Sequence, residues 1–423
     1  MSAAPDPRAL FTSLFDAAVA AADPRRTIRA FLPTRPKGRM VVIGAGKGSA
    51  QMAAALEEAW DGPLAGVVVT RYGYAAPCRQ IEVLEAAHPV PDAAGLAAAR
   101  RLSSAVAGLT QDDLVIALIS GGGSALLPAP PAGMSLDDEI AVNKALLASG
   151  APISAMNTIR KHLSAIKGGR LAATAHPAKV VTLVVSDIPG DNPAFVASGP
   201  TVPDPAGRAD ALRLVETYGI ALPEAAMRHL GSPAADTPEP DDPRFARDEV
   251  HVIASAALSL EAAAAEAKRR GVEAVILSDA IEGEAKEVGG VHAAIAREIA
   301  TRNRPFRKPV LLLSGGETTV TVRGSGGRGG RNGEFLLALA LGMDGVAGIH
   351  AFAADTDGID GTEDNAGAFA DFTSAARMRR AGLDPRAVLA AHDSWGAFDA
   401  VGDLFAPGPT GTNVNDLRAV LVA

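Results

Sequence analysis

Residues 41–49 read Val-Val-Ile-Gly-Ala-Gly-Lys-Gly-Ser and join a short apolar run to a glycine-rich loop. Four later segments repeat this pattern of an apolar run that ends in glycine, serine or aspartate: 114–124, 180–191, 310–317 and 350–361. Short continuous apolar runs followed by helical stretches are typical of buried parallel strands. In such sheets ligands bind outside the carboxyl ends of the strands, so we expect the five loops to lie along the functional edges.

The length and composition predict two α/β domains. The chain has 423 residues, of which 48% are hydrophobic, and this is too long for one ordinary core. The segment 231–248 is rich in proline and aspartate, which is typical of a boundary or a long exposed loop. We therefore expect a larger, Rossmann-like parallel-sheet domain over 1–240, a smaller α/β domain over 241–423, and a cleft between them.

The charge and cysteine content exclude several classes of protein. A net charge of −8 without a long basic run disfavours nucleic acid and anionic membranes as partners. The single cysteine, Cys78, excludes an intrachain disulfide framework and a cysteine-based zinc site, and it fits a reducing cytoplasm. Neither a signal peptide nor a window of about 18 uncharged apolar residues is present. We expect a cytoplasmic protein without a membrane span.

The first loop resembles two nucleotide-binding motifs but fits neither. A dinucleotide fingerprint needs a third glycine where Ser49 stands, and a Walker A loop needs Ser or Thr directly after Lys47, where the chain has glycine. What remains is a strand, a loop containing Gly46 and Lys47, and a helix N-terminus, which favours anions. The next strand ends at Arg71, which in a dinucleotide fold permits only NADP. The loop therefore predicts a phosphate or carboxylate site, although a solvated lysine in a tight turn is the alternative.

The second loop is a stronger sign of anion binding. Three consecutive glycines after a buried strand have little packing purpose and cost conformational entropy. Exposed backbone donors and two hydroxyl groups make a nest for phosphate or carboxylate, and a close helix–strand crossing is the alternative. The candidate residues are Ser120, Gly121, Gly122, Gly123 and Ser124.

A basic helix is predicted over 154–174. Asn157, Arg160 and Lys161 lie within about one turn, and Lys167 follows further along. One cationic face directed into a cleft would hold a carboxylate or phosphate. A solvated basic face is an equally weighted alternative.

The third loop contains two carboxylates, Asp187 and Asp191, four residues apart. Two acids at the end of a strand suit Mg²⁺, or one metal ligand and one general base, whereas an Asx turn is the structural alternative. A separate rigid loop contains His88, and a lone histidine is more often structural than catalytic.

The loops of the C-terminal part combine glycine with charge. The fourth loop contributes Gly315, Gly316 and Glu317, and the segment 323–334 follows with three arginines among its glycines. Arginine binds phosphate with two hydrogen bonds, so a mobile arginine loop before a helix fits phosphoryl transfer. A disordered surface loop is the alternative. The candidate residues in this segment are Arg331 and Asn332.

The fifth loop places Asp355, Asp357 and Asp360 within six residues after a buried strand. The spacing is wrong for an EF-hand, because no glutamate stands at the twelfth position. A site for Mg²⁺ with a nucleotide is the better interpretation, with Asp355 and Asp357 as its candidate ligands.

Eight stretches follow one another along the chain: VVIGAGKGSAQMAAALE, AAHPVPD, SGGGSALL, MNTIRKHLSAIKGGRLA, VVSDIPGDNPAFVASGPTVPDP, LLSGGETTVTVRGSGGRGGRNGEFLLALAL, AADTDGIDGTEDNAGAFAD and GPTGTNVNDL. In these motifs and their order, the chain resembles the class II glycerate kinases, also called the MOFRL-type or glycerate 2-kinases. The resemblance implies two α/β domains that face a cleft, and transfer of a phosphoryl group from ATP to D-glycerate with a divalent metal such as Mg²⁺. By resemblance, the catalytic roles fall on Lys47, Asp187, Asp191 and Arg331. One departure is Gly333, where the family usually has glutamine.

The resulting hypothesis is in-line phosphoryl transfer to glycerate by a monomer or homodimer. Lys47 and Arg331 would offset transition-state charge, and replacing either by alanine is expected to lower turnover far more than stability. The site would be complete only when both domains close on it. Three alternatives stay open: an NAD(P)H-dependent hydroxypyruvate or tartronate-semialdehyde reductase, a non-catalytic sensor, and a kinase for another small hydroxy acid.

Overall fold

The computed structural model describes residues 6–322 and 326–423. The chain divides into two compact units. We call Pro24–Ile253 the parallel-sheet unit, and we call the residues up to Asp23 together with Ala254–Ala423 the mixed-sheet unit. The expected domain boundary between residues 240 and 241 stays a prediction. The sequence placed the N-terminal helix in the first domain, whereas in the structure this helix belongs to the mixed-sheet unit.

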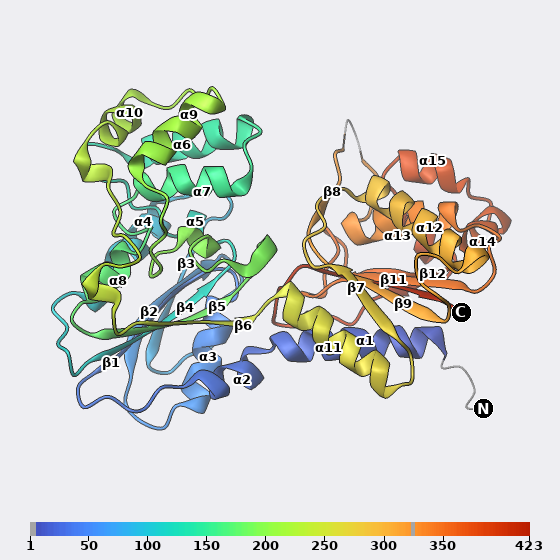
Figure 1. Ribbon diagram of the computed structural model, residues 1–423, viewed down its shortest axis with the longest axis horizontal. Coiled ribbons are helices and arrows are strands. Elements are labelled where there is room, and N and C mark those ends of the chain that lie inside the picture. The colour runs from blue at the N-terminus through green and yellow to red at the C-terminus, as the bar shows by residue number, and fades with distance from the viewer. Residues whose placement is uncertain (1–5, 323–325) are drawn as a thin grey trace. The chain divides into compact units, whose positions relative to one another are not determined.

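The parallel-sheet unit is built on a six-stranded sheet with the strand order β3-β2-β1-β4-β5-β6 (Figure 1). All four pairings from β3 to β5 are parallel. β1 and β4 are buried along their whole length, as expected for central strands covered on both faces. The strands are β1 (Met40–Ala45), β2 (Ala65–Arg71), β3 (Ile81–Ala86), β4 (Leu114–Ser120), β5 (Lys179–Val185) and β6 (Glu249–Ala254).

Helices cover both faces of this sheet. Figure 1 shows α4 (Ala93–Val106) and α8 (Arg170–Ala175) on one face and α3 (Ser49–Ala59) on the other. Alternate residues of β1 share one core with α4 and α8, because neighbouring residues of a strand point to opposite faces. This is the Rossmann-like architecture that the sequence predicts. Shorter helices in the unit are α2 (Pro24–Thr27) and α5 (Gly123–Leu126).

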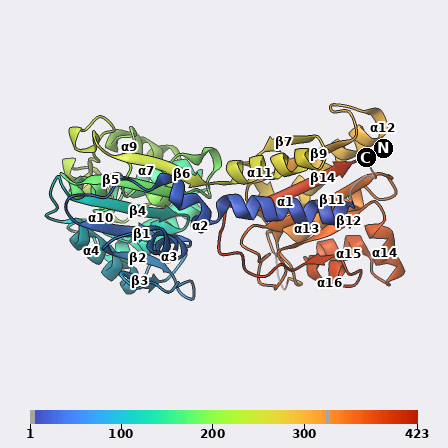
Figure 2. The same ribbon diagram turned by 90° about the horizontal axis from the view of Figure 1, so that it is seen from below.

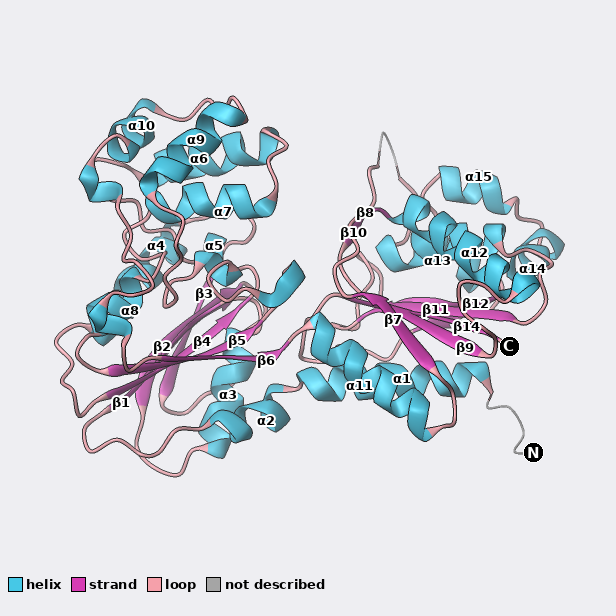
Figure 3. Ribbon diagram, in the orientation of Figure 1, coloured by secondary structure: helices cyan, strands magenta, loops and turns pink. Residues whose placement is uncertain are grey.

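A second group of helices packs around its own core within the parallel-sheet unit (Figure 3). The predicted single helix over 154–174 is wrong, because the chain leaves α7 at His162 and starts α8 only at Arg170. Gly168 and Gly169 between them adopt the left-handed conformation that favours glycine, with φ of 63° and 79°. The group consists of α6 (Leu136–Ala148), α7 (Ile153–His162), α9 (Arg208–Thr217) and α10 (Glu224–Leu230).

The mixed-sheet unit contains a sheet with the order β13-β12-β11-β14-β9-β7. The expectation of parallel neighbours is wrong here: only β7 and β9 pair in parallel, and the other pairings are antiparallel. β14 is inserted between β9 and β11, so these two strands still run in the same direction. Their carboxyl ends therefore lie at one edge, beside the start of β14. The strands are β7 (Ala274–Ser278), β9 (Val310–Ser314), β11 (Ile349–Asp355), β12 (Gly367–Asp371), β13 (Leu404–Phe405) and β14 (Asp416–Val422).

Helices cover both faces of the mixed sheet (Figure 1), and in the view from below α1 lies in front of its strands (Figure 2). α1 (Pro7–Ala22) and α11 (Ala256–Arg269) bury one face, where Phe11 stacks on Phe352 with ring centroids 5.8 Å apart. α12 (Ala285–Arg302) and α13 (Arg331–Gly342) bury the other. Smaller elements are β8 (Gly283–Glu284), β10 (Thr318–Thr319), α14 (Ser374–Arg380), α15 (Pro385–Ala390) and α16 (Ser394–Asp399). Within the described residues, no helix has the length and apolarity that a membrane crossing requires.

Candidate active site

The strand order of the parallel sheet reverses between β1 and β4, and ligands bind such sheets at this point. The loops that follow the two strands are held together. Gly48 donates a backbone hydrogen bond to Ser120 Oγ at 3.0 Å, and the Lys47 N–H donates to the Gly121 oxygen at 2.8 Å. A side chain at Gly46 would begin 2.1 Å from Ser120 Oγ, so only glycine fits there. The predicted loops thus meet, but these two amide groups and Ser120 bind the protein itself.

Three polar side chains from different strands surround the peptide between Gly121 and Gly122. The position of a Cβ on Gly121 lies 1.7 Å from Asp187 Oδ2. The corresponding position on Gly122 lies 3.0 Å from His88 Nε2 and 3.1 Å from Lys47 Cγ. Lys47, His88 and Asp187 follow β1, β3 and β5, so the parallel register brings them to one edge.

His88 is the residue of this cluster to which the sequence assigned a structural role. Burial lowers the pKa of His88 to about 4, and the charges of Lys47 and Arg71 lower it in the same direction. The imidazole is therefore neutral near pH 7. A signal was present in the sequence, since His88 follows a strand of the same parallel set, but a single histidine is weak evidence for a site.

Replacing Gly121 by alanine is expected to disable this cluster. The new methyl group would occupy the place of the Asp187 carboxylate, so either the loop or Asp187 must move. A displacement of about 1 Å at a reacting group lowers rates roughly 100-fold, so we expect a loss of this size in kcat. Steady-state kinetics measures it.

The matched control is Gly290→Ala, because Gly290 lies on the exposed side of α12 with no atom within 4 Å of its Cβ position. Its kcat should equal that of the wild type. Wild-type turnover in Gly121→Ala would show that Asp187 does not need this position.

A hydroxyl and amide network extends from the second loop to α7. Ser124 Oγ lies 2.8 Å from Ser198 Oγ, and Asn157 Oδ1 accepts from Ser198 Oγ at 3.4 Å and from Arg160 at 3.2 Å. Arg160 also donates to Asn143 Oδ1 at 2.8 Å. The structure thus brings the predicted Ser124, Asn157 and Arg160 together, and Arg160 contacts amides rather than a carboxylate.

The loop after β5 has unusual backbone geometry. Asp191, Ala197 and Ser198 have φ values of 52°, 53° and 60°, although none is glycine. Such conformations cost about 1–3 kcal/mol each and are concentrated at binding sites. Asp191 ends a short 3₁₀ turn four residues beyond Asp187.

The predicted cationic face of the basic helix does not exist. Lys161 is buried and pairs with Asp204 at 2.5 Å, and Lys167 is buried and pairs with Glu139 at 3.0 Å. Both charges are therefore neutralised inside the parallel-sheet unit. By contrast, none of the salt bridges recorded within the described residues involves Lys47.

Replacing Lys161 by methionine is expected to lower the stability of the parallel-sheet unit by about 3–5 kcal/mol, because Asp204 would stay buried without a partner. The chain has two tryptophans, Trp60 and Trp395, one in each unit. In a Trp395→Phe background, the fluorescence of Trp60 during urea unfolding reports on this unit alone.

Lys144→Met on the exposed face of α6 is the control, and its effect should stay within about 0.5 kcal/mol. An unchanged urea midpoint in Lys161→Met, together with weaker substrate binding, would restore the ligand-binding role of Lys161.

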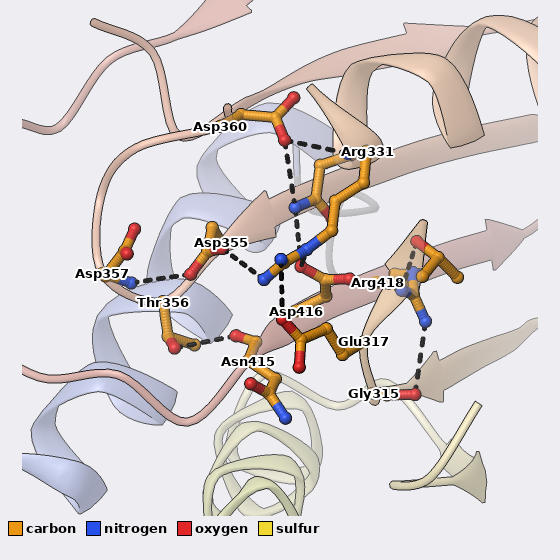
Figure 4. Close-up of polar contacts among 12 residues, drawn as sticks. Gly315, Glu317, Arg331, Asp355, Thr356, Asp357, Asp360, Asn415, Asp416 and Arg418 are labelled. Atoms are coloured by element: carbon orange, nitrogen blue, oxygen red, sulfur yellow. Dashed lines mark hydrogen bonds and ion pairs between the residues drawn. The ribbon is translucent and has the colours of Figure 1, made fainter. Parts of the chain in front are cut away.

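In the mixed-sheet unit, Arg331 lies among three carboxylates (Figure 4). Its guanidinium contacts Asp416 at 2.8 Å, Asp355 at 2.6 Å and Glu317 at 3.1 Å. Burial disfavours the charged guanidinium, but these carboxylates outweigh burial and raise the pKa of Arg331 above its ordinary value. Two predicted residues, Glu317 and Asp355, thus converge on a third, Arg331.

Asp416 and Arg418 are functional candidates that the sequence analysis missed. Asp416 is paired with Asp355 across β14 and β11, so two buried carboxylates face Arg331 from neighbouring strands. Arg418 is fully buried; it donates to the Gly315 oxygen at 3.2 Å and contacts Asp416 at 2.5 Å. The available signal was the spacing Asp-Leu-Arg at the start of an otherwise apolar strand, which places both charges on one face.

The N-terminus of α13 is occupied by a carboxylate of the protein. Asp360 accepts hydrogen bonds from the backbone N–H groups of Asn332 at 3.0 Å and Gly333 at 2.8 Å. Burial raises the pKa of Asp360 to about 6. The Asn332 amide donates to Asp416 at 2.8 Å. The backbone N–H groups of Asn332 and Gly333 at the start of this helix therefore already bind Asp360.

The described part of the arginine loop is fixed by side-chain contacts. The Arg328 guanidinium lies 3.5 Å from the Trp395 ring centroid and pairs with Glu363 at 2.5 Å. The predicted Arg323, Gly324 and Ser325 lie outside the described residues. A side chain at Gly333 would begin 2.6 Å from Ser394 Oγ, so Ser394 fills the space that a larger residue at 333 would need.

The two predicted metal ligands, Asp355 and Asp357, lie together, but several of their carboxylate oxygens already bind other groups of the protein. Asp355 Oδ1 accepts from the Asp357 N–H at 3.1 Å, its other oxygen contacts Arg331, and Asp357 Oδ1 accepts from the Ile359 N–H at 2.8 Å. Among the described residues, no group of three or more His, Cys, Asp or Glu side chains could hold a metal ion. Mg²⁺ that arrives with a nucleotide needs only one or two protein carboxylates, and Asp357 fits that requirement.

A pocket of about 730 Å³ opens beside Arg331 and Glu317, entirely within the mixed-sheet unit. Its volume is typical of small-molecule sites. Its wall includes Glu334, whose carboxylate lies 2.8 Å from His392 Nδ1. Neither Glu334 nor His392 was a candidate from the sequence. The other lining residues are Glu282, Gly283, Thr318, Thr319, Val320, Val322, Gly327, Gly329, Gly330 and Gly361.

Comparison with known proteins shows the family of the chain. Two family descriptions match the chain: a domain of unknown function, DUF4147, over residues 10–231, and the MOFRL family over residues 310–416. The chain is 43% identical over 394 residues to a glycerate 2-kinase from Pyrococcus horikoshii, covering 91% of this chain and 88% of that protein. A crystal structure of a glycerate kinase from Thermotoga maritima is similar with a TM-score of 0.89 and 39% identity, over 98% of this chain and 99% of that one. The chain belongs to the MOFRL-type glycerate kinases.

Membership of the MOFRL-type glycerate kinases confirms the resemblance seen in the sequence. One relative has a different name: a protein from Agrobacterium vitis, called "Putative hydroxypyruvate reductase", is 55% identical over 417 residues, covering 98% of this chain and 94% of that protein. The two names are given to proteins that are similar to this chain over nearly its whole length.

Proposed function

We propose that this protein transfers the γ-phosphoryl group of ATP to the 2-hydroxyl of D-glycerate, giving 2-phosphoglycerate and ADP. As a glycerate kinase family member, the chain is a phosphotransferase with an alcohol acceptor. The relative from Pyrococcus horikoshii is named a glycerate 2-kinase, which supports the 2-position. The proposed reaction forms a bond between the hydroxyl oxygen and the γ-phosphorus and breaks the bond to the bridging oxygen of ADP.

The observation that carries the proposal is the juxtaposition of Lys47, His88 and Asp187 around Gly121 and Gly122. Lys47 supplies positive charge for the carboxylate of the acceptor or for the transferring group, because its side chain lies beside His88 at the ligand-binding edge of the sheet. Asp187 takes the proton from the attacking hydroxyl, as a carboxylate within hydrogen-bonding reach does in general base catalysis. Asp191 orients the same loop. The backbone of Gly46 and of residues 120–124 forms the base of the proposed substrate site.

The mixed-sheet residues are proposed to serve the nucleotide. Arg331 would offset phosphoryl charge, with Gly315, Gly316, Glu317 and Asn332 around it. Asp357, with Asp355 if Arg331 releases it, would hold Mg²⁺. The ion would neutralise charge on the phosphate oxygens. These assignments rest on the contacts of Arg331 and on the family resemblance.

Phosphorus NMR of the product tests the proposal directly. With ATP, Mg²⁺ and D-glycerate, the expected result is a new phosphate ester signal that coincides with authentic 2-phosphoglycerate. A signal at 3-phosphoglycerate would reject the 2-position, and ADP formation independent of glycerate would reject the acceptor.

The reductase remains a second candidate because of the name of the relative from Agrobacterium vitis and because the parallel sheet has the strand order of dinucleotide-binding folds. Two features disfavour it: Ser49 stands at the third glycine position, and its hydroxyl donates to the Leu118 oxygen at 2.9 Å. Loss of NADH or NADPH absorbance with hydroxypyruvate is the assay. We expect none above background.

A further inference from the structure

His88 lies at the ligand-binding edge of the parallel sheet. It follows β3, and its Nε2 and Lys47 Cγ lie within 3.0 and 3.1 Å of the same point, the Cβ position of Gly122. Gly122 has a φ of 80°, so the loop exposes its backbone here without a side chain in the way. The histidine ring and the lysine stem are therefore neighbours across a bare stretch of backbone.

The ring of His88 has hydrogen-bonding capacity that the protein does not use. Within residues 6–322 and 326–423, no hydrogen bond is recorded for either of its ring nitrogens. The side chain is half-buried, and two cations act on it, Lys47 and Arg71. The guanidinium carbon of Arg71 lies 3.6 Å from the Tyr74 ring centroid. The charges of Lys47 and Arg71 both disfavour a third positive charge on His88. A neutral imidazole offers one donor and one acceptor.

We propose that His88 binds the acceptor substrate as a neutral group, with Nε2 in a hydrogen bond to the small hydroxy acid that Lys47 attracts by charge. The inference rests on the proposed function and names a residue of the same site. The two neighbouring residues then have different roles: Lys47 binds the negative charge of the substrate, and His88 fixes the orientation of the substrate. A hydrogen bond fixes the orientation of the hydroxyl group relative to the phosphorus atom that it attacks, which a point charge cannot do.

The variants that test this are His88→Ala and His88→Gln, because the glutamine amide nitrogen can replace Nε2 whereas alanine cannot. The matched control is His176→Gln. His176 also precedes a proline and belongs to the same unit, but it is exposed and precedes β5, at the opposite edge of the sheet. The conservative glutamine variant separates loss of a hydrogen bond from loss of the folded loop.

In His88→Ala, we expect the KM for D-glycerate to rise at least about tenfold, while the KM for ATP stays within about twofold, since one lost hydrogen bond is worth about a factor of ten. His88→Gln should recover part of the loss, and His176→Gln should match the wild type. Thermal unfolding of all four proteins should agree within about 2 °C. The inference is wrong if KM for both substrates rises equally, or if glutamine and alanine behave alike.

The same experiment separates this inference from the proposed function. Absence of glycerate kinase activity in the wild type would reject the function, whereas an active wild type with an unaltered His88→Ala variant would reject only the inference. Titration calorimetry with D-glycerate, without ATP, gives a readout that does not depend on turnover. Binding to the wild type that is at least about tenfold weaker in His88→Ala supports His88 as a ligand contact, and equal binding or no binding to either protein overturns it.

Discussion

Replacement of Lys47 by methionine is expected to lower kcat by about 100- to 1,000-fold with little change in stability. Methionine keeps most of the length of the side chain and removes only its charge. The buried salt bridges described above for this unit pair other lysines, Lys161 with Asp204 and Lys167 with Glu139. A cation that meets developing negative charge in a transition state contributes several kcal/mol, which gives the expected factor. Single-turnover kinetics with D-glycerate and ATP measures it.

Lys37→Met is the matched control, because Lys37 is exposed and precedes the other end of β1. Its kcat should equal the wild-type value. Near-normal turnover of Lys47→Met at saturating substrate would remove Lys47 from the site. A large fall in its unfolding temperature would instead show that the charge serves the fold.

Replacement of Arg331 by methionine is expected to lower the stability of the mixed-sheet unit by about 3–5 kcal/mol in addition to any loss of activity. The sequence favoured a purely catalytic arginine. In the structure, Asp355 and Asp416 are buried opposite each other on adjacent strands, and removal of Arg331 takes away the cation that contacts Asp355, whereas Asp416 keeps its contact with Arg418. Urea unfolding in a Trp60→Phe background, where Trp395 reports on this unit, measures the effect.

The loss in the free energy of unfolding caused by Arg331→Met should become smaller as the pH falls from 8 to 5. Burial raises the pKa of Asp355 well above its usual range, Arg331 opposes this, and Asp416 raises it further. Without Arg331 the carboxyl group binds a proton more readily in the folded than in the unfolded state, so stability decreases as pH rises. A deficit that is independent of pH would contradict this account.

Two further variants sharpen the test. Asp355→Asn added to Arg331→Met should restore part of the stability at pH 8, because it removes one of the opposed charges. Arg379→Met removes a surface arginine that pairs with Asp344, and it should cost no more than about 1 kcal/mol. If both arginine variants cost the same, the buried carboxylate pair does not depend on Arg331.

The sequence predicted the strands because each apolar run is continuous and ends in small residues. It also predicted that Gly46, Ser120 and Asp187 lie at one edge, since parallel strands align their carboxyl ends. It did not predict that β14 separates β9 from β11, because pairing between distant segments leaves no trace in local composition. For that reason Asp416, the residue beside both strand ends, was missed.

Charge patterns were the least informative part of the sequence. Lys161 and Lys167 read as a cationic surface, yet each pairs with a buried acid that is distant along the chain, Asp204 or Glu139. Helical spacing shows which residues share a face but not whether that face meets solvent. His88 illustrates the opposite error. It stands alone in the sequence, but in the structure its neighbours Lys47 and Asp187 follow other strands of the same sheet.

The insertion of β14 also constrains how the chain folds during synthesis. The parallel-sheet unit is continuous, Pro24–Ile253, so its residues are all synthesised before Ala254–Ala423 of the mixed-sheet unit. The mixed sheet needs its last described strand in a central position, and α1 from the start of the chain covers one face. Its folding therefore waits for late translation, while α1 stays exposed with its apolar face uncovered. We therefore expect chaperones in the cell to bind α1 between the synthesis of this helix and the synthesis of β14.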